Sequence, residues 1–296
     1  LARPPSREQA AALERSLRWA EHPGHHLLTL ADAAYPQALL AIHDPPAVLY
    51  VAGDPARLSP QAIAIVGARH ATPDGLANAR AYARPLAQRG WCIVSGLALG
   101  IDTAAHEGAL EAGPDAGGTV AVVGTGVDVV YPTRNRALAE RIAAQGAIVS
   151  EFPLGLPALP HQFPRRNRLV AGLARGTLVA EAAARSGSLI TARLAADAGR
   201  EVFAIPGSIH SPLSRGCHAL IRQGAKLVES AQDILDELGI PAGSRQPSPE
   251  PAPPRDPLLA GMGYGPIHVD ALAARTGLAV PALQARLLEL ELQGRI

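Results

Sequence analysis

The sequence predicts a doubly wound α/β domain with a mostly parallel sheet, followed by a small helical module. The first observation is a series of apolar runs of strand length that begins at Ala62 and alternates with amphipathic helical patterns. The second is that these runs are apolar throughout, as expected for parallel strands whose two faces are both covered by helices. The third is a change of composition after residue 240, where proline and polar residues replace the alternation.

The N-terminal segment precedes this alternation. Residues 6–21 predict one amphipathic helix, with Ser6 as its N-cap and with Leu13 and Leu17 four residues apart. A single helix cannot bury its own apolar stripe, so we expect this stripe to pack against another element. Residues 25–54 combine short strands with turn-rich sequence.

The alternation itself supplies the strands and helices of the sheet. The predicted strands are residues 62–67, 91–96, 119–124, 147–151, 177–181, 201–207 and 225–230. The helical patterns between them include residues 75–90 and 134–146.

The C-terminal part has a different organisation. Residues 241–257 are rich in proline, polar and without periodicity, which predicts an extended linker. Residues 258–296 hold three short helical patterns with a tight turn before the last, which indicates a helix-turn-helix. Because the sequence ends at Ile296, where a wing would begin, we expect a winged-helix-like module without its wing.

Composition limits the classes of function. The formal net charge is only +1, so any nucleic-acid contact must depend on a local cluster of cations and not on a global basic field. The two cysteines give neither a disulfide framework nor a metal-ligand spacing, and Cys92 is expected in the core. No apolar run is long enough to cross a membrane and no signal peptide is visible, so we expect a cytoplasmic protein.

Small residues follow the predicted strands at the edge where a doubly wound sheet binds ligands. They lie in the turns Gly67-Ala68-Arg69, Ser95-Gly96 with Gly100, Gly124-Thr125-Gly126 and Pro206-Gly207-Ser208, and in residues 186–191. Glycine lets a backbone approach a ligand closely, and helix N-termini offer free amides to an anion. Neither the dinucleotide fingerprint nor the P-loop pattern is present, so we expect neither ligand nor any other cofactor.

The segment His161–Ala174, with the sequence HQFPRRNRLVAGLA, joins an aromatic ring to a basic cluster. Pro164 is predicted at the first position of a helix, directly after Phe163. Arg165, Arg166 and Arg168 should then surround the helix start and bind phosphate, while Phe163 stacks on a base. The alternative is that Phe163 fills a gap in the core and that the arginines are solvated.

No catalytic arrangement is evident, so we do not expect an enzyme. His106 on an amphipathic pattern is expected to be structural, and Asp102 is expected to be an N-cap. Glu181 ends a predicted strand and is the best single candidate for acid–base chemistry.

Seven blocks of this sequence carry a resemblance to the DprA family, DNA-processing protein A or Smf. The blocks are IAIVGARHAT, IVSGLALGIDTAAHEGAL, TVAVVGTGVDVVYPTRNRALAERI, SEFPLG, FPRRNRLVAGLA, EAAARSGSLITA and FAIPGSIHSPLSRGCHALIRQGAKLV. The resemblance covers residues 25–240 in order, and it implies an extended Rossmann-like domain. It also implies a protein that binds and protects single-stranded DNA and loads the RecA recombinase in natural transformation, as a homodimer paired through the Rossmann domain.

The resemblance also transfers binding residues by motif. The nucleic-acid-binding residues that it implies are Gly67, Arg69, Ser95, Gly96, Phe163, Arg165, Arg166, Asn167, Arg168, Ser186, Gly187 and Ser188. No metal site is implied.

Two departures from the family pattern leave open what the C-terminal module binds, and two alternative functions are kept beside the resemblance. Residues 1–24 would be the remnant of a larger helical module, and residues 258–296 lack the wing. One alternative is an enzyme like the nucleotide phosphoribohydrolases of the lysine-decarboxylase-like group, whose PGGxGTxxE segment has only SGSLITA as a counterpart here. The other is a duplex DNA binder that uses the C-terminal helices.

Overall fold

The computed structural model describes residues 6–58, 61–239, 258, 262 and 267–292. The chain divides into two compact units, Leu1–Pro241 and Ala242–Ile296, which are described separately. The predicted linker, residues 241–257, lies outside the described residues.

In the described part of the first unit, nine strands form one sheet in the order β1-β2-β6-β5-β4-β3-β7-β8-β9. The strands are β1 (His25–Thr29), β2 (Val48–Gly53), β3 (Ala62–Val66), β4 (Cys92–Ser95), β5 (Thr119–Val122), β6 (Ala147–Ser150), β7 (Gly176–Val179), β8 (Glu201–Ala204) and β9 (Lys226–Leu227). All pairings from β6 to β9 across the sheet are parallel. The β1–β2 hairpin adds an antiparallel edge to β6, so the predicted, mostly parallel sheet is confirmed.

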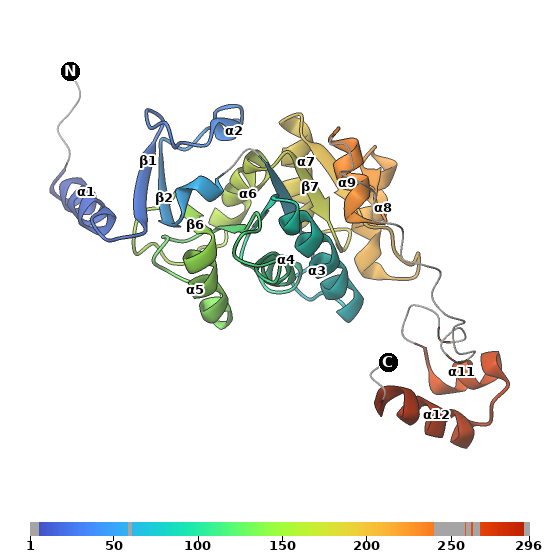
Figure 1. The fold of residues 1–296 in the computed structure, drawn as a ribbon. Helices are drawn as coiled ribbons and strands as arrows, with labels where there is room; N and C mark the ends of the chain where they lie inside the picture. The colour runs from blue at the N-terminus through green and yellow to red at the C-terminus, as the bar shows by residue number, and fades with distance from the viewer. Residues whose placement is uncertain (1–5, 59–60, 240–257, 259–261, 263–266, 293–296) are drawn as a thin grey trace. The chain divides into compact units, whose positions relative to one another are not determined.

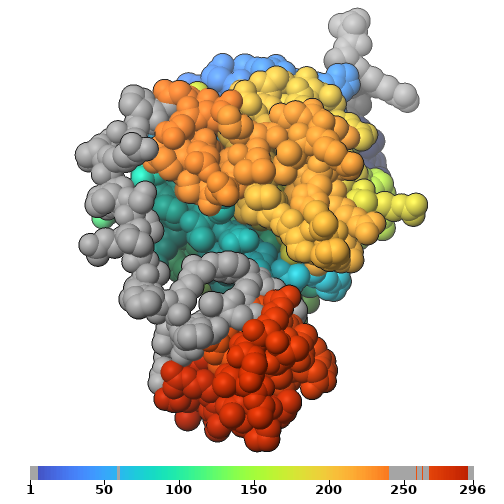
Figure 2. Space-filling model, turned by 90° about the vertical axis from the view of Figure 1, so that its right-hand side faces the viewer, coloured from blue at the N-terminus to red at the C-terminus, as the bar shows by residue number. Residues whose placement is uncertain are grey.

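Helices cover both faces of this sheet (Figure 1). One face carries α2 (Gln37–Leu40), α6 (Gln162–Leu173), α7 (Ser188–Asp197) and α8 (Arg215–Arg222). The other carries α3 (Pro73–Gln88), α4 (Ile101–Leu110), α5 (Arg136–Gln145) and α9 (Ala231–Glu237). Seen from the edge that carries β8 and β9, the yellow and orange segments of the chain form a continuous surface (Figure 2).

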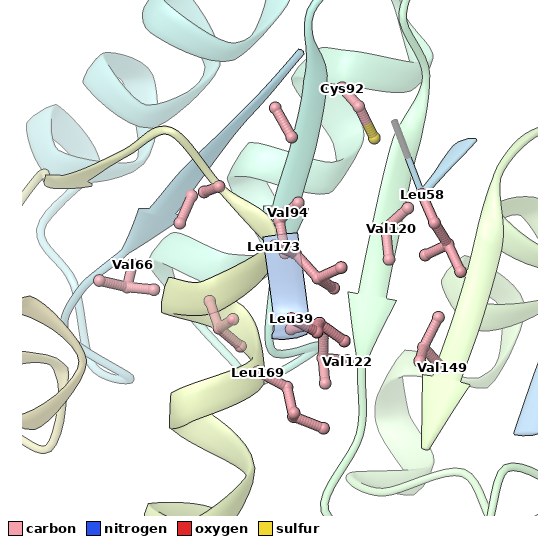
Figure 3. Close-up of a cluster of buried hydrophobic side chains, with 14 of the residues drawn as sticks. Leu39, Leu58, Val66, Cys92, Val94, Val120, Val122, Val149, Leu169 and Leu173 are labelled. Carbon is pink, nitrogen blue, oxygen red and sulfur yellow. The ribbon is translucent and has the colours of Figure 1, made fainter. Parts of the chain in front are cut away.

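The strand residues alternate between the two cores because successive side chains of a strand point to opposite faces. Ala62, Ala64 and Val66 of β3 pack with α6 and α2, whereas Ile63 and Ile65 pack with α3 and α4. The first of these cores joins leucines of α6 to valines of β4 and β5 (Figure 3). Cys92 lies in it at 1% exposure, which confirms the expected core position.

The order of the strands creates a crevice at β3. The chain steps from β3 through β4 and β5 to β6 and then returns through α6 to β7, on the other side of β3. The loops that follow β3 and β7 therefore leave in opposite directions. Such a switch point is where doubly wound sheets bind ligands.

Helix α1 (Arg7–Ala20) begins as predicted but packs differently. Ser6 accepts a hydrogen bond from the Gln9 amide in a complete capping box. However, Leu13 and Leu17 are 57% and 53% exposed, so the prediction that their stripe packs against another element is wrong. The helix is held at its C-terminal end, where the Trp19 ring stacks on His25 at 4.2 Å between centroids. A tryptophan offers far more contact area than a leucine, which explains why this end determines the packing.

The second unit contains α11 (Val269–Thr276) and α12 (Val280–Leu292), as predicted. Gly277 ends α11 with a φ of +70°, a left-handed conformation that glycine adopts at little cost. Leu258, Leu272, Leu283 and Leu290 form a small core. The predicted helix at residues 258–263 and the predicted absence of a wing fall mainly on residues that are not described.

Candidate functional site

A cleft of about 570 Å³ lies at the switch point of the sheet. The turns after β3 and β4, the start of α6 and the start of α7 form its walls. Of the residues predicted for the site, it is lined by Gly67, Arg69, Gly96, Phe163, Arg166, Asn167, Ser186, Gly187 and Ser188. The structure therefore brings together residues that are more than 100 positions apart in the sequence.

Arg166 forms part of the cleft and is 5% exposed. Its Nη1 donates a hydrogen bond to the Val122 carbonyl, whereas its Nε has no hydrogen-bond partner among the described residues. A Cβ at Gly96 would overlap the guanidinium, so this close approach requires glycine. Burial lowers the pKa of Arg166 to about 10, against the opposing effect of Asp102. The fold therefore holds a cation at the cleft at a cost in solvation.

Asp102 is a buried carboxylate whose charge interacts with this cation, and the prediction that it is an N-cap is wrong. Gly100, with a φ of +78°, occupies the N-cap position of α4, and Asp102 lies in the first turn. Its Oδ2 accepts hydrogen bonds from the amides of Gly96 at 3.0 Å and Ala98 at 3.4 Å. Burial raises the pKa of Asp102, and Arg166 opposes this shift. Asp102 thus fixes the turn after β4 against the cleft.

Phe163 lies inside the first turn of α6, because the helix begins at Gln162 and not at Pro164 as predicted. Proline is accepted anywhere in a first turn, since amides there have no acceptor within the helix. The ring packs on Gly124, where a Cβ would lie 2.9 Å from Cδ1. The Arg69 guanidinium carbon lies 5.7 Å from its centroid. Phe163 is therefore half-buried between a glycine and a cation.

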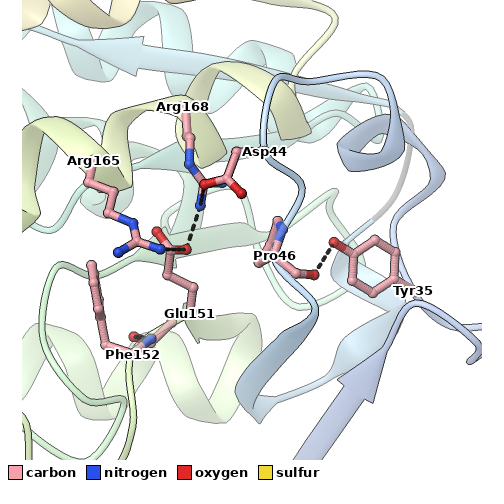
Figure 4. A network of polar contacts seen from close by, with 8 residues as sticks. Tyr35, Asp44, Pro46, Glu151, Phe152, Arg165 and Arg168 are labelled. Atoms are coloured by element: carbon pink, nitrogen blue, oxygen red, sulfur yellow. Dashed lines mark hydrogen bonds and ion pairs between the residues drawn. The ribbon is translucent and has the colours of Figure 1, made fainter. Parts of the chain in front are cut away.

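The three arginines of the segment do not form one cluster at the cleft, which corrects our expectation. Arg168 forms an ion pair with Glu151 at 2.5 Å, and Arg165 approaches the same carboxylate at 3.5 Å (Figure 4). Residues 165 and 168 share one face of a helix, whereas residue 166 is turned by about 100°. Only Arg166 lines the cleft, with Asn167 beside it.

Among the other predicted residues, some line the cleft and one does not. Ser186, Gly187 and Ser188 lie at the start of α7, and the two serine hydroxyls are 2.7 Å apart. Ser95 does not line the cleft, because its hydroxyl is fully buried and donates to the Ile65 carbonyl at 2.6 Å.

Glu181, the predicted acid–base candidate, has a structural role in the hydrogen bonding of the α3 N-terminus. Glu181 accepts hydrogen bonds from the Thr72 amide at 2.9 Å and the Thr72 hydroxyl at 2.8 Å, at the start of α3. His106 is fully buried against Thr119, and burial lowers its pKa to about 3, as expected for a structural histidine. The described residues hold no group of three or more side chains arranged to bind a metal ion.

Sequence reasoning missed Tyr131, which lines the cleft from the loop after β5. Its ring centroid lies 5.5 Å from that of Phe163. Only 3% of the residues are aromatic, so a tyrosine in a loop at the ligand-binding edge was a usable signal. Asp102 and Pro160 also line the cleft and were not predicted there, whereas Ile190 and Thr191 belong to the predicted segment 186–191.

Comparison with known proteins gives consistent matches over most of the chain. Residues 26–239 match the family described as DNA recombination-mediator protein A, and residues 242–296 match the DprA winged helix domain. Protein Smf of Escherichia coli is 44% identical over 96% of this chain and 78% of its own length. DNA processing protein DprA of Streptococcus pneumoniae is 47% identical over 71% of this chain and 73% of its own length.

Two solved structures share the fold. The X-ray structure of the Streptococcus pneumoniae protein has a TM-score of 0.68 at 43% identity, over 78% of this chain and 83% of that one. A structure of DNA processing protein A from Helicobacter pylori, concerned with its single-stranded DNA binding mode, has a TM-score of 0.64 at 33% identity. That comparison covers 72% of this chain and 95% of the other.

Proposed function

Because the chain belongs to the DNA recombination-mediator protein A family, we propose that the cleft at the switch point binds single-stranded DNA without sequence preference. The observation that carries the proposal is the meeting of two arginines and an aromatic pair in one cleft. The Helicobacter pylori relative, whose solved structure concerns single-stranded DNA binding, supports the same chemistry.

The cleft offers separate partners for the phosphate and the base of a nucleotide. Arg69 is exposed and Arg166 is buried, so the strand can pair with one cation at the rim and another deeper in the cleft. The N-terminal turn of α7 adds backbone amides that favour an anion. Stacking of bases on an aromatic ring adds affinity with little sequence preference.

The geometry favours a single strand over a duplex. A cleft of about 570 Å³ has room for a few nucleotide groups and not for a double helix. In a duplex the bases are stacked on each other, so they cannot reach Phe163 or Tyr131 without unpairing.

We predict tighter binding of an unstructured oligonucleotide than of a matched duplex, measured by titration at two salt concentrations. Replacing Arg69 with alanine should weaken binding and lower the slope of log K against log salt by roughly 0.7, because one phosphate contact is lost. Arg89→Ala is the matched control, since Arg89 is also exposed but ends α3 at the opposite edge of the sheet. Equal affinity for the single strand and the duplex would contradict the proposal.

The wider role that we propose follows the family. The protein would act in the cytoplasm as a homodimer paired through the Rossmann domain, protect incoming strands and load a RecA recombinase in natural transformation. The description of the family as a recombination mediator supports this role. Among the described helices, none has the length and apolar character needed to cross a membrane.

We therefore expect a dimer mass in light scattering at micromolar concentration. We also expect faster ATP hydrolysis by a RecA recombinase on a strand coated with single-strand-binding protein when this chain is added. A monomer mass, or a rate that this chain does not change, would remove the corresponding part of the proposal.

Neither alternative function has comparable support. Glu181, the acid–base candidate, is engaged with Thr72 and does not line the cleft. A duplex binder would need several cations on α12, but this helix carries a single arginine, Arg286, which forms an ion pair with Glu289. Its exposed residues also include Leu288 at 57%, Leu292 at 81% and the acidic Glu291.

A further inference from the structure

The aromatic ring that is most open to a ligand in the cleft is that of Tyr131. It is 47% exposed, whereas Phe163, which the sequence singles out, is half-buried. Gly124 and Arg69 already contact the Phe163 ring. Less of that ring is therefore available to an incoming base.

The Tyr131 ring is also held by a well-anchored loop. The Val129 amide donates to the Gly126 carbonyl at 2.9 Å, and the Thr125 hydroxyl donates to the Val129 carbonyl at 2.6 Å. On the other side of Tyr131, the Asn135 side chain donates to the Leu97 carbonyl at 2.9 Å. A ring on a fixed loop loses little conformational freedom when a ligand binds.

The two rings differ in orientation. Their planes are inclined by 38°, with centroids 5.5 Å apart, so one flat base cannot stack fully on both. Tyr131 therefore offers a stacking surface of its own beside that of Phe163. The Tyr131 hydroxyl makes no hydrogen bond to another residue in the part of the chain that the structure describes.

We propose that Tyr131 is the principal base-stacking residue of the cleft and that Phe163 is mainly its support. This inference rests on the proposed binding of single strands and adds the residue that contacts the base. The exposed ring, its anchored loop and its position in a cleft with two arginines carry it.

The test compares an oligothymidine with a fully abasic strand of the same length, which keeps the phosphates and lacks every base. Tyr131→Ala should weaken binding of oligothymidine about tenfold and leave binding of the abasic strand unchanged. Tyr131→Phe keeps the ring and should bind both strands like the wild type. Leu17→Ala removes a similarly exposed apolar side chain on α1, far along the sheet from β3, and should change neither affinity.

Each outcome separates this inference from the proposed function. If the wild type binds neither strand, the proposed function fails. If the wild type binds both strands equally, or if Tyr131→Ala loses affinity equally for both, strand binding stands but base stacking on Tyr131 is overturned. If instead Phe163→Leu shows the base-dependent loss and Tyr131→Ala does not, the assignment of the two rings is reversed and the inference is wrong. Thermal unfolding of Tyr131→Ala should match the wild type, which excludes an effect through the fold.

Discussion

Replacing Glu151 with alanine is expected to lower the free energy of unfolding by about 3–5 kcal/mol, because it leaves the Arg168 guanidinium buried without its main partner. The side chains of Glu151 and Arg168 are 5% and 12% exposed. Asp44 also approaches Arg168, at 3.7 Å, but its side chain is 65% exposed and can compensate only in part. Urea unfolding followed by circular dichroism measures the loss.

Two further variants identify the cause of this loss. Arg165 approaches the same carboxylate from a side chain that is 57% exposed, so Arg165→Ala should cost less than about 1 kcal/mol. The double variant Glu151→Ala, Arg168→Met removes both buried charges and should recover most of the stability lost in the single variant. A single variant that unfolds at the wild-type urea concentration would show that the ion pair does not stabilise the fold.

This network explains why the basic segment could be predicted only in part from the sequence. The helical period already separates residue 166 from residues 165 and 168, so a split into two faces could have been derived. The binding partner of the face that carries Arg165 and Arg168 could not be derived from the sequence. This partner, Glu151, follows β6 and meets α6 only through the packing of the helix on the sheet. A cluster of like charges in a sequence need not be a cluster in space.

The sheet was more predictable than the segments around it. Runs such as Ala62–Val66 are apolar at every position because both faces are covered, and that property is local to the run. The exposed Leu13 and Leu17 show the opposite case, since periodicity identifies the apolar face of a helix but not whether a partner covers it. Tyr131 lies in a loop without periodicity, so only its position after β5 could indicate its place in the cleft.

The second large effect is expected at Arg166, where binding and stability should separate. Arg166→Met keeps an apolar chain of similar length and removes the cation at the cleft. We expect weaker strand binding and a slope of log K against log salt that falls by roughly 0.7 per lost phosphate contact. The same titration as for Arg69→Ala measures both quantities.

The stability of Arg166→Met should depend on pH through Asp102. Burial already raises the pKa of Asp102 above its ordinary value of 3.8, and Arg166 opposes that rise, so removing the cation should raise this pKa further. A carboxyl whose pKa is higher in the folded state binds its proton more tightly there than in the unfolded state. Its contribution is therefore most favourable below pH 3.8 and is lost as the pH rises through the folded-state pKa. Thermal unfolding from about pH 4 to about pH 8 should show a steeper decline than in the wild type.

The double variant Arg166→Met, Asp102→Asn decides whether the pair is coupled in this way. It removes the titrating group, so the additional pH dependence should disappear. Both charges are disfavoured by burial in the wild type, since the pKa of Arg166 is lowered to about 10 and that of Asp102 is raised. The double variant should therefore be as stable as the wild type, or more stable by about 1–4 kcal/mol, while strand binding stays weak. Recovery of binding together with stability would show that Arg166 acts on the strand only through the fold, and an unchanged pH profile in the single variant would show that its charge does not act on Asp102.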